Sequence, residues 1–422
     1  MFRLDSIIIH GGKRLDGTVR IQGSKNAVLP MMSASVLHDG VTVLEGCPRI
    51  SDVCFMTEIL KCLGAQIRWE GHTLFIDGSG INASVIPAIY GVQMRSSVTL
   101  MGSLLGRMHR FEMPFPGGCV IGKRPVDLHI QVLRSLGAKV EEKDGILRAS
   151  CESPEGFCHV FKKKSVGATE NAILAAVRAK GKTRLSGCSV EPEIIWLCRF
   201  LEAMGVTIRG VGTEHLMITG TVRLKDTAFE VPADRIVAGT YLMAGAATRG
   251  QIILEHAPVD EMTSILDAYK KMGGQYEVSS GKLVADSRGV QKPLPYIETD
   301  VYPGLPTDLQ SPLLAVLAGI PGSSHVRETV FEDRYKIIPQ LNRMGASVTV
   351  SGRDAYVEGQ PGLHGEKVSA RELRGGAALV IAALSAQGES QVLNRHYIER
   401  GYEDICKDIC SLGGEIRIDK DD

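Results

Sequence analysis

The segment DVCFMTEILKCLGAQIRW, residues 52–69, joins an amphipathic helix to a strand across the Leu-Gly step at Gly64. Apolar residues recur with helical spacing before the glycine and alternate with polar residues after it. Glycine suits this junction because a helix that ends in a left-handed residue needs a positive φ there. Five further segments repeat the pattern at intervals of about 70 residues, with their glycines at Gly137, Gly205, Gly273, Gly345 and Gly413. The chain is therefore expected to be an array of similar units.

A second kind of helix precedes each amphipathic one and has no polar face. These segments are rich in Ala, Gly, Leu, Ser and Val, with little charge in their middles. A helix that is apolar all round is a buried helix. The expected buried helices cover residues 26–40, 95–107, 167–181, 235–250, 309–322 and 374–388.

Short alternating stretches between the helices, such as TLFIDG (73–78) and AYVEG (355–359), predict strands. Each unit then reads as a βαβαββ-like repeat, and six repeats account for the chain. The sixth repeat lacks its final strand. Because LDSIIIHGG (4–12) matches the missing strand in pattern, we expect the N-terminal strand to close the sixth unit.

Six repeats around one core would exceed the usual limit of ~250–300 residues. We therefore expect an α/β protein of two domains with three repeats each. One domain would be residues 23–232, and the other residues 1–22 together with 233–422. Two crossings of the chain, near 22–25 and 231–235, predict a hinge.

The composition of the 422 residues excludes several classes. Lys plus Arg and Asp plus Glu both number 48, and a formal net charge of zero argues against a nucleic-acid partner. The longest apolar stretch, 377–384, is far shorter than the ~18 residues of a membrane helix, so we expect no membrane partner. With no secretory signal at the start, a reduced cytoplasmic compartment is expected. The cysteine pairs Cys54/Cys62 and Cys406/Cys410 are expected in the core.

Charged residues gather at the N-terminal ends of the expected buried helices, where free N–H groups and the helix dipole attract anions. If the buried helices of each domain run in one direction, these residues would line a cleft for a small anionic substrate. Any one of them could instead be an ordinary cap or a partner in a salt bridge. They are Lys25, Arg95, Lys164 with Ser165, Asp234 with Arg235, Asp308, and Glu372 with Arg374.

The stretch FPGGCVIGKRPVDLH (115–129) places Cys119 after two glycines and near Lys123 and Arg124. Nearby cations lower the pKa of a cysteine thiol, although the stretch alone also fits a surface turn. Arg124 and Arg400 hold matching positions in the second and sixth repeats, and paired guanidiniums suit carboxylate and phosphate. No Walker loop, GxGxxG, HExxH or metal-type His/Cys spacing occurs, so we expect neither a cofactor nor a metal.

Several motifs together resemble the UDP-N-acetylglucosamine 1-carboxyvinyltransferase family, in register from about Leu15 to the C-terminus. They are GSKNAVLP (23–30), MRSSVTLMGSLL (94–105), PGGCVIGKRPVDLH (116–129), SVGAT (165–169), PTDLQ (306–310), ETVFEDRY (328–335) and ERGYE (399–403). The resemblance implies a two-domain inside-out α/β barrel of the kind found in 5-enolpyruvylshikimate-3-phosphate synthase. It also implies transfer of the enolpyruvyl group of phosphoenolpyruvate to the 3′-hydroxyl of UDP-N-acetylglucosamine with release of phosphate, the first committed step of peptidoglycan synthesis.

The resemblance further implies roles for matching residues. Cys119 would be the proton donor and Asp308 the base, with Lys25 and Arg400 also catalytic. Phosphoenolpyruvate would be bound by Lys25, Asn26, Arg124, Arg374 and Arg400. The nucleotide sugar would be held by Asn26, Arg95, Arg124, Pro125, Val126, Asp127, Leu128, Lys163, Lys164, Ser165, Val166, Asp308 and Val330.

Two positions depart from the family's pattern. Glu372 stands where Asp is usual before Leu-Arg, and the tail begins Tyr397-Ile-Glu where His-Ile-Asp is common. Three alternatives stay open. A 3-phosphoshikimate 1-carboxyvinyltransferase is disfavoured by Cys119 and by SKN (24–26) in place of SKS, and a ring-shaped DNA clamp by the zero net charge. A non-catalytic UDP-sugar-binding paralogue is disfavoured by the intact set of Lys25, Cys119, Asp308, Arg374 and Arg400.

Overall fold

The computed structural model describes residues 6–91, 95–115 and 126–419. The internal contacts divide these residues into two compact units with separate hydrophobic cores. We call residues 23–115 with 126–232 the central unit, and residues 6–22 with 233–419 the terminal unit. Three of the predicted site residues, Cys119, Arg124 and Pro125, lie outside the described residues.

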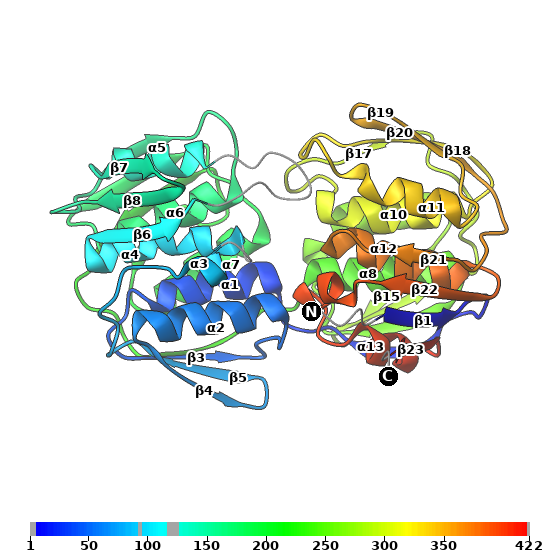
Figure 1. Cartoon of the computed structure of the whole chain (residues 1–422), viewed down its shortest axis with the longest axis horizontal. Coiled ribbons are helices and arrows are strands. Elements are labelled where there is room, and N and C mark those ends of the chain that lie inside the picture. The colour runs from blue at the N-terminus through cyan, green and yellow to red at the C-terminus, as the bar shows by residue number, and fades with distance from the viewer. Residues whose placement is uncertain (1–5, 92–94, 116–125, 420–422) are drawn as a thin grey trace. The chain divides into compact units, whose positions relative to one another are not determined.

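The described part of the central unit has three sheets and three helices that are buried almost throughout (Figure 1). Its buried helices are α1 (Lys25–Ser35), α4 (Leu100–Met108) and α6 (Val166–Val177). Its amphipathic helices are α2 (Ser51–Leu63), α5 (Asp127–Ser135) and α7 (Pro192–Ala203). Its sheets, in strand order, are β13 (Thr227–Glu230), β3 (Val41–Glu45), β5 (Thr73–Asp77) and β4 (Gln66–Glu70); β6 (Arg110–Pro114), β8 (Ile146–Ser150) and β7 (Lys139–Lys143); and β11 (Thr207–Arg209), β12 (His215–Thr219), β10 (Lys182–Ser186) and β9 (Cys158–Val160).

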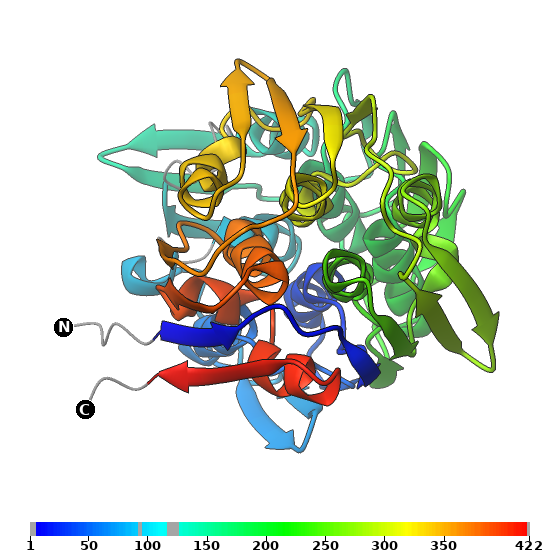
Figure 2. The same cartoon turned by 90° about the vertical axis from the view of Figure 1, so that its right-hand side faces the viewer.

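The terminal unit repeats this plan, with four strands in each of the three sheets formed by its described residues. Figure 2 shows its buried helices close together, with strands around them. These helices are α8 (Arg235–Thr248), α10 (Gln310–Ala318) and α12 (Leu373–Ser385), and the amphipathic helices are α9 (Thr263–Lys271), α11 (Ile338–Arg343) and α13 (Ile405–Ser411). The sheets are β15 (Gln275–Ser279), β16 (Lys282–Asp286), β14 (Gln251–Glu255) and β2 (Asp16–Arg20); β17 (Ile297–Glu298), β18 (Gly322–Arg327), β20 (Asp354–Gly359) and β19 (Val348–Ser351); and β21 (Lys367–Ser369), β22 (Glu389–Leu393), β1 (Ser6–His10) and β23 (Glu415–Asp419). Shorter helical turns in the two units are α3 (Ala88–Gly91), η1 (Arg95–Thr99), η2 (Val259–Glu261), η3 (Thr307–Leu309), η4 (Tyr335–Ile337) and η5 (Arg395–Arg400).

The glycine at each helix-to-strand step has a positive φ, which confirms the repeat read from the sequence. The φ values run from 83° at Gly413 to 108° at Gly64. A side chain is strained in this left-handed region, so glycine is the residue that lets each amphipathic helix turn into its strand.

The N-terminal strand closes the sixth repeat, as predicted. β1 lies between β22 and β23 and is antiparallel to both, with Ile7 opposite Val392 on one side and Ile418 on the other. Figure 2 shows β1 and β23 side by side. Residues from both ends of the chain therefore complete one sheet of the terminal unit.

Each of the four-stranded sheets contains one parallel pair of strands. Within a repeat, the strand before a buried helix pairs with the strand after it, as in β9–β10 and β21–β22. Where the chain passes between units the partners are exchanged, because β13 pairs with β3 and β2 pairs with β14. As a result, every sheet is built from strands of one unit only.

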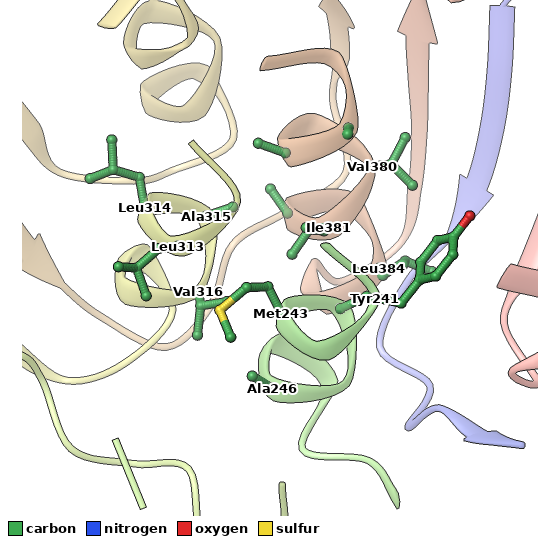
Figure 3. Packing of buried hydrophobic residues seen from close by; sticks show 14 of the residues in the cluster. Tyr241, Met243, Ala246, Leu313, Leu314, Ala315, Val316, Val380, Ile381 and Leu384 are labelled. Atoms are coloured by element: carbon green, nitrogen blue, oxygen red, sulfur yellow. The ribbon is translucent and has the colours of Figure 1, made fainter. Parts of the chain in front are cut away.

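Apolar side chains of the three buried helices fill the core of the terminal unit. Figure 3 shows Met243 of α8 beside Val316 of α10, with Ile381 of α12 nearby. All three are 1% exposed or less, and full burial of such a side chain stabilises a fold by about 1.5–3 kcal/mol. In the described residues, no helix is both long and apolar enough to cross a membrane.

One detail of the sequence reading was wrong. Cys54, Cys62 and Cys410 are exposed rather than in the core, since they lie on the outer faces of amphipathic helices; only Cys406 of the two pairs is buried. The fifth amphipathic helix begins with a 3₁₀ turn, η4, which passes directly into α11. Pro339 at the start of α11 has no N–H to bond a carbonyl in the preceding turn, which favours the 3₁₀ form there.

Candidate active site

Lys25 begins α1 and is buried against a carboxylate from the next helix. Its Nζ lies 2.8 Å from Oδ2 of Asp52, whose side chain is fully buried in the first turn of α2. Ser24 caps α1 by accepting a hydrogen bond from the N–H of Ala27. The pair therefore fixes an ammonium group at the positive end of a buried helix, where an anion is favoured. Asn26, the next residue of α1, is partly buried.

The nucleotide-sugar residues predicted around η1, α5 and α6 are brought together by Asn171. Its Nδ2 donates to the carbonyl of Val98 in η1 and to Nδ1 of His129 in α5, at 3.0 and 2.8 Å. Its Oδ1 accepts from the N–H of Gly102 in α4. One buried amide of α6 thus connects η1, α4 and α5, so the elements that carry Arg95, Asp127 and Val166 are linked to one another.

The remaining predicted residues of the central unit differ in exposure. Asp127 and Lys163 are exposed, Val126 is buried, and Leu128, Arg95 and Val166 are partly buried. Lys164 forms an ion pair of 2.6 Å with Glu214, and Ser165 caps α6 by accepting from the N–H of Ala168. The structural roles of Lys164 and Ser165 do not conflict with binding, because a capped helix end still presents N–H groups.

In the terminal unit, Asp308 lies in η3 between two buried guanidinium groups. Its Oδ1 accepts from Nη2 of Arg334 at 2.7 Å, and its Oδ2 accepts from Nε and lies 3.0 Å from Nη2 of Arg374. The arginine side chains are 2% and 3% exposed, whereas that of Asp308 is 27% exposed. The carboxylate is therefore held from the protein side while part of it reaches the surface of the unit.

Arg374 stays charged although it is buried. Burial alone would lower its pKa, but the charge of Asp308, followed by Tyr402 and Asp234, outweighs burial and raises the pKa of Arg374 above its usual value. Nη1 of Arg374 donates to the hydroxyl of Tyr402 at 3.4 Å, and that hydroxyl lies 2.8 Å from Oγ1 of Thr240. The guanidinium is fixed in position by contacts on more than one side.

Glu372, the residue that departs from the family's pattern, caps α12. Its carboxylate accepts from the N–H groups of Arg374 and Gly375, and lies 3.7 Å from Nη1 of Arg334. Its extra methylene is therefore accommodated at a helix N-terminus, where a negative charge is favourable.

Arg400 ends η5, which packs on the first turns of α12. A Cβ added to Gly376 of α12 would lie 2.7 Å from Cγ1 of Ile398, and one added to Gly401 would lie 2.8 Å from Cδ2 of Leu373. Glycine at both points lets the segment that carries Arg400 approach the segment that carries Arg374. Val330 lies in the turn after β18 and is partly buried.

A group of carboxylates in the central unit was not predicted. Glu170 of α6 is 6% exposed. Burial is the main cause that raises its pKa to about 8, and the nearby charges of Glu193 and Glu191 add to the effect. Glu170 is therefore mostly protonated at neutral pH.

Replacing Glu170 by glutamine is expected to remove a pH dependence of stability. Since its pKa in the folded chain, about 8, lies above the ordinary value near 4.5, stability is fully present below pH 4.5 and falls as the pH rises through 8. The slope in this window is ~1 kcal/mol per pH unit. Melting temperatures from pH 5 to 9 should show the advantage of Glu170→Gln growing with pH. An offset that is constant with pH, or the same trend in the exposed control Glu202→Gln, would contradict this.

Sequence reasoning missed Asp52, Asn171, Arg334 and Tyr402, which hold the predicted residues in place. Arg334 and Tyr402 do lie within the motifs ETVFEDRY and ERGYE, so the resemblance contained a signal for them. Asp52 and Asn171 carry no local signal, because their partners come from other elements.

Comparison with known proteins identifies the class of this fold. The enolpyruvyl transferase NikO from Streptomyces tendae superposes with a TM-score of 0.87 at 24% identity over 99% of both chains. The EPSP synthase of Acinetobacter baumannii superposes with a TM-score of 0.74 at 18% identity over 98% of this chain and 100% of that one. At these identities the likeness establishes the fold, that of the enolpyruvyl transferases.

Sequence comparison identifies the family of the chain within the enolpyruvyl transferase fold. Residues 9–409 match the family model for EPSP synthase (3-phosphoshikimate 1-carboxyvinyltransferase). UDP-N-acetylglucosamine 1-carboxyvinyltransferase 2 of Caldanaerobacter subterraneus subsp. tengcongensis is 41% identical, over 97% of this chain and 98% of its own length. The corresponding enzyme of Novosphingobium aromaticivorans is 40% identical over 98% and 99%. The chain belongs to the UDP-N-acetylglucosamine 1-carboxyvinyltransferase family, a family of transferases within the EPSP synthase type.

Proposed function

We propose that this chain transfers the enolpyruvyl group of phosphoenolpyruvate to the 3′-hydroxyl of UDP-N-acetylglucosamine and releases phosphate. The reaction is the first committed step of peptidoglycan synthesis. The observation that carries the proposal is the identity of 40–41% with enzymes of this name over nearly the whole of both chains. The arrangement of charged groups in both units supports it.

The substrates are anions, and the groups proposed to hold them are cations fixed by carboxylates. Lys25, Asn26, Arg374 and Arg400, with Arg124, would contact phosphoenolpyruvate. Lys25 is held by Asp52 and Arg374 by Asp308. Cations that are already oriented stabilise developing negative charge without rearrangement during the reaction.

The chemistry requires three proton transfers. In the addition step, Cys119 would give a proton to C3 of phosphoenolpyruvate while the 3′-oxygen bonds to C2, and Asp308 would accept the hydroxyl proton. In the elimination step, C3 would return a proton to the Cys119 thiolate while the bond from C2 to the phosphate oxygen breaks, which restores both the double bond and the thiol. Two guanidinium groups hold the Asp308 carboxylate in a fixed orientation, with part of it left exposed for the acceptor hydroxyl.

The nucleotide sugar would be held mainly by elements that Asn171 ties together in the central unit. Contacts to the nucleotide sugar would come from Arg95, Val126, Asp127, Leu128 and residues 163–166. Arg124 and Pro125, which lie outside the described residues, would add to them, and Asp308 and Val330 would meet the sugar. The proposal includes no metal, cofactor, nucleic-acid or membrane partner. It places the reaction in the cytoplasm.

Phosphate release from phosphoenolpyruvate tests the proposal, with UDP-N-acetylglucosamine or shikimate 3-phosphate as acceptor. We expect release with the nucleotide sugar alone, and a fall of at least ~10²-fold in Cys119→Ala because a positioned acid is lost. The control Cys62→Ala, which changes an exposed cysteine of the central unit, should match the wild type.

The other outcomes separate the alternatives. Release with shikimate 3-phosphate alone would assign the chain to the sister activity. Absence of release with either acceptor, from a folded protein, would leave a binding protein. Full activity of Cys119→Ala would remove the cysteine from the mechanism but keep the reaction.

A further inference from the structure

A buried carboxylate, Glu328, connects the two parts of the terminal unit that are proposed to meet the sugar. Glu328 follows β18 and is 1% exposed. Its Oε2 accepts from the hydroxyl of Thr307 at 2.9 Å. Its Oε1 accepts from the backbone N–H groups of Val330 and Phe331 at 2.9 and 3.0 Å. The hydroxyl comes from the residue next to Asp308, and one N–H comes from Val330 itself.

A second connection joins the same two segments. Arg334 donates from Nε to the carbonyl of Thr307 at 3.3 Å and from Nη2 to Oδ1 of Asp308. The segment 328–334 therefore holds the Thr307–Asp308 turn at two points, through Glu328 at its start and Arg334 at its end. The position of Asp308 relative to Val330 depends on both.

The Glu328 carboxylate is better suited to orienting the groups around it than to stabilising the fold. A buried carboxylate is costly to desolvate, and the hydrogen bonds that it accepts offset this cost. The side-chain partners that the structure gives it among the described residues are one hydroxyl and two backbone N–H groups. An ionised carboxylate accepts at both oxygens, so it can hold a turn and a neighbouring side chain at once, whereas an amide can accept at one atom only.

The backbone of this turn has separate support. Thr329 donates two hydrogen bonds to Thr299, from its N–H to Oγ1 at 3.0 Å and from its hydroxyl to the carbonyl at 2.6 Å. Arg353 donates from Nη1 to the carbonyls of Glu328 and Thr329, at 3.1 and 2.7 Å. Loss of the Glu328 carboxylate should therefore leave the strand and the turn in place and loosen only the orientation of Val330 and of the Thr307–Asp308 turn.

We infer that Glu328 is a positioning residue for the acceptor sugar, setting the Asp308 turn and the Val330 backbone at a fixed spacing. This inference rests on the proposed function, since it takes its substrate from there. Glu328 touches neither reacting atom in this account and acts through Thr307, Asp308 and Val330.

Steady-state kinetics of Glu328→Gln tests the inference. We expect the KM for UDP-N-acetylglucosamine to rise roughly tenfold or more, as for loss of hydrogen bonds to a charged group. The KM for phosphoenolpyruvate should change less than about twofold. Thr307→Val removes only the hydrogen bond from Thr307 to Glu328 and should give a smaller rise in the KM for UDP-N-acetylglucosamine. The double variant should fall short of the product of the two effects, because the residues share one contact.

The control is Glu358→Gln. Glu358 is an exposed residue of β20 that also accepts a hydroxyl hydrogen bond, from Ser323 at 2.6 Å, and its replacement should leave both KM values unchanged. Equal rises in both KM values together with a lowered melting temperature would show that Glu328 is structural only and overturn the inference, as would unchanged KM values. If Glu328→Gln does not fold, an unchanged KM for the sugar in Thr307→Val overturns it. A wild type that does not turn over UDP-N-acetylglucosamine defeats the proposed function instead.

Discussion

Replacing Asp308 by asparagine is expected to lower kcat by roughly 10²–10⁴-fold, the usual contribution of a positioned general base. Asparagine keeps the size of the side chain but cannot accept the hydroxyl proton. In the wild type, Arg334 and Arg374 each donate to one carboxylate oxygen of Asp308. Asparagine would instead turn an amide N–H₂ toward one of these two arginines. Phosphate release at saturating substrate measures the effect.

The matched control is Asp286→Asn. Asp286 has the same 27% side-chain exposure as Asp308, lies in the same unit, and is also paired with an arginine, Arg288. The control should keep wild-type kcat. If Asp308→Asn keeps it as well, the carboxylate serves only to hold its two arginines, and another group must take the proton.

Replacing Lys25 by methionine is expected to have the largest effect on stability, together with loss of activity. The change removes an ammonium that lies 2.8 Å from a fully buried carboxylate. Breaking a buried pair in this way costs about 3–5 kcal/mol, because the remaining charge is poorly solvated. Chemical denaturation of the full chain measures the loss, and phosphate release measures the activity.

Two companion variants separate structure from function. Lys61→Met breaks an exposed pair with Glu58 of similar length, 2.7 Å, and should cost less than about 1 kcal/mol. The double variant Lys25→Met/Asp52→Asn should recover stability, since no charge is left behind, but not activity. Recovery of activity as well would contradict a role for Lys25 in binding or catalysis.

The repeat was predictable because it depends on residues that are close together in the sequence. Gly64 and its five counterparts need a positive φ that few other residues tolerate, and the period changes from helical to alternating at each of them. The closing strand β1 was predictable for a similar reason, since the sixth repeat lacked a strand that the N-terminal segment could supply. The 3₁₀ turn η4 at the start of the fifth amphipathic helix is accounted for by Pro339, whose effect is also local.

The partners of the site residues were less predictable. The end-of-helix positions of Lys25, Asp308 and Arg374 follow from the sequence, but their pairing with Asp52 and Arg334 depends on how separate helices pack. Arg334 illustrates the difficulty. It begins a segment that reads as an amphipathic helix, where an arginine is expected at the surface, yet its side chain is 2% exposed because η4 replaces the first turn of that helix.

The position of β1 between β22 and β23 has a consequence for how the chain acquires its structure during synthesis. Every described strand of the central unit lies within residues 41–230, so that unit can pair all of its strands while the ribosome still holds the later repeats. β1 is made before the central unit, but its neighbours span residues 389–419 and are made after that unit. Pairing between such distant segments is slow to form, and domains generally fold as units in order of synthesis. β1 must therefore wait for its two partner strands until residues 389–419 have left the ribosome.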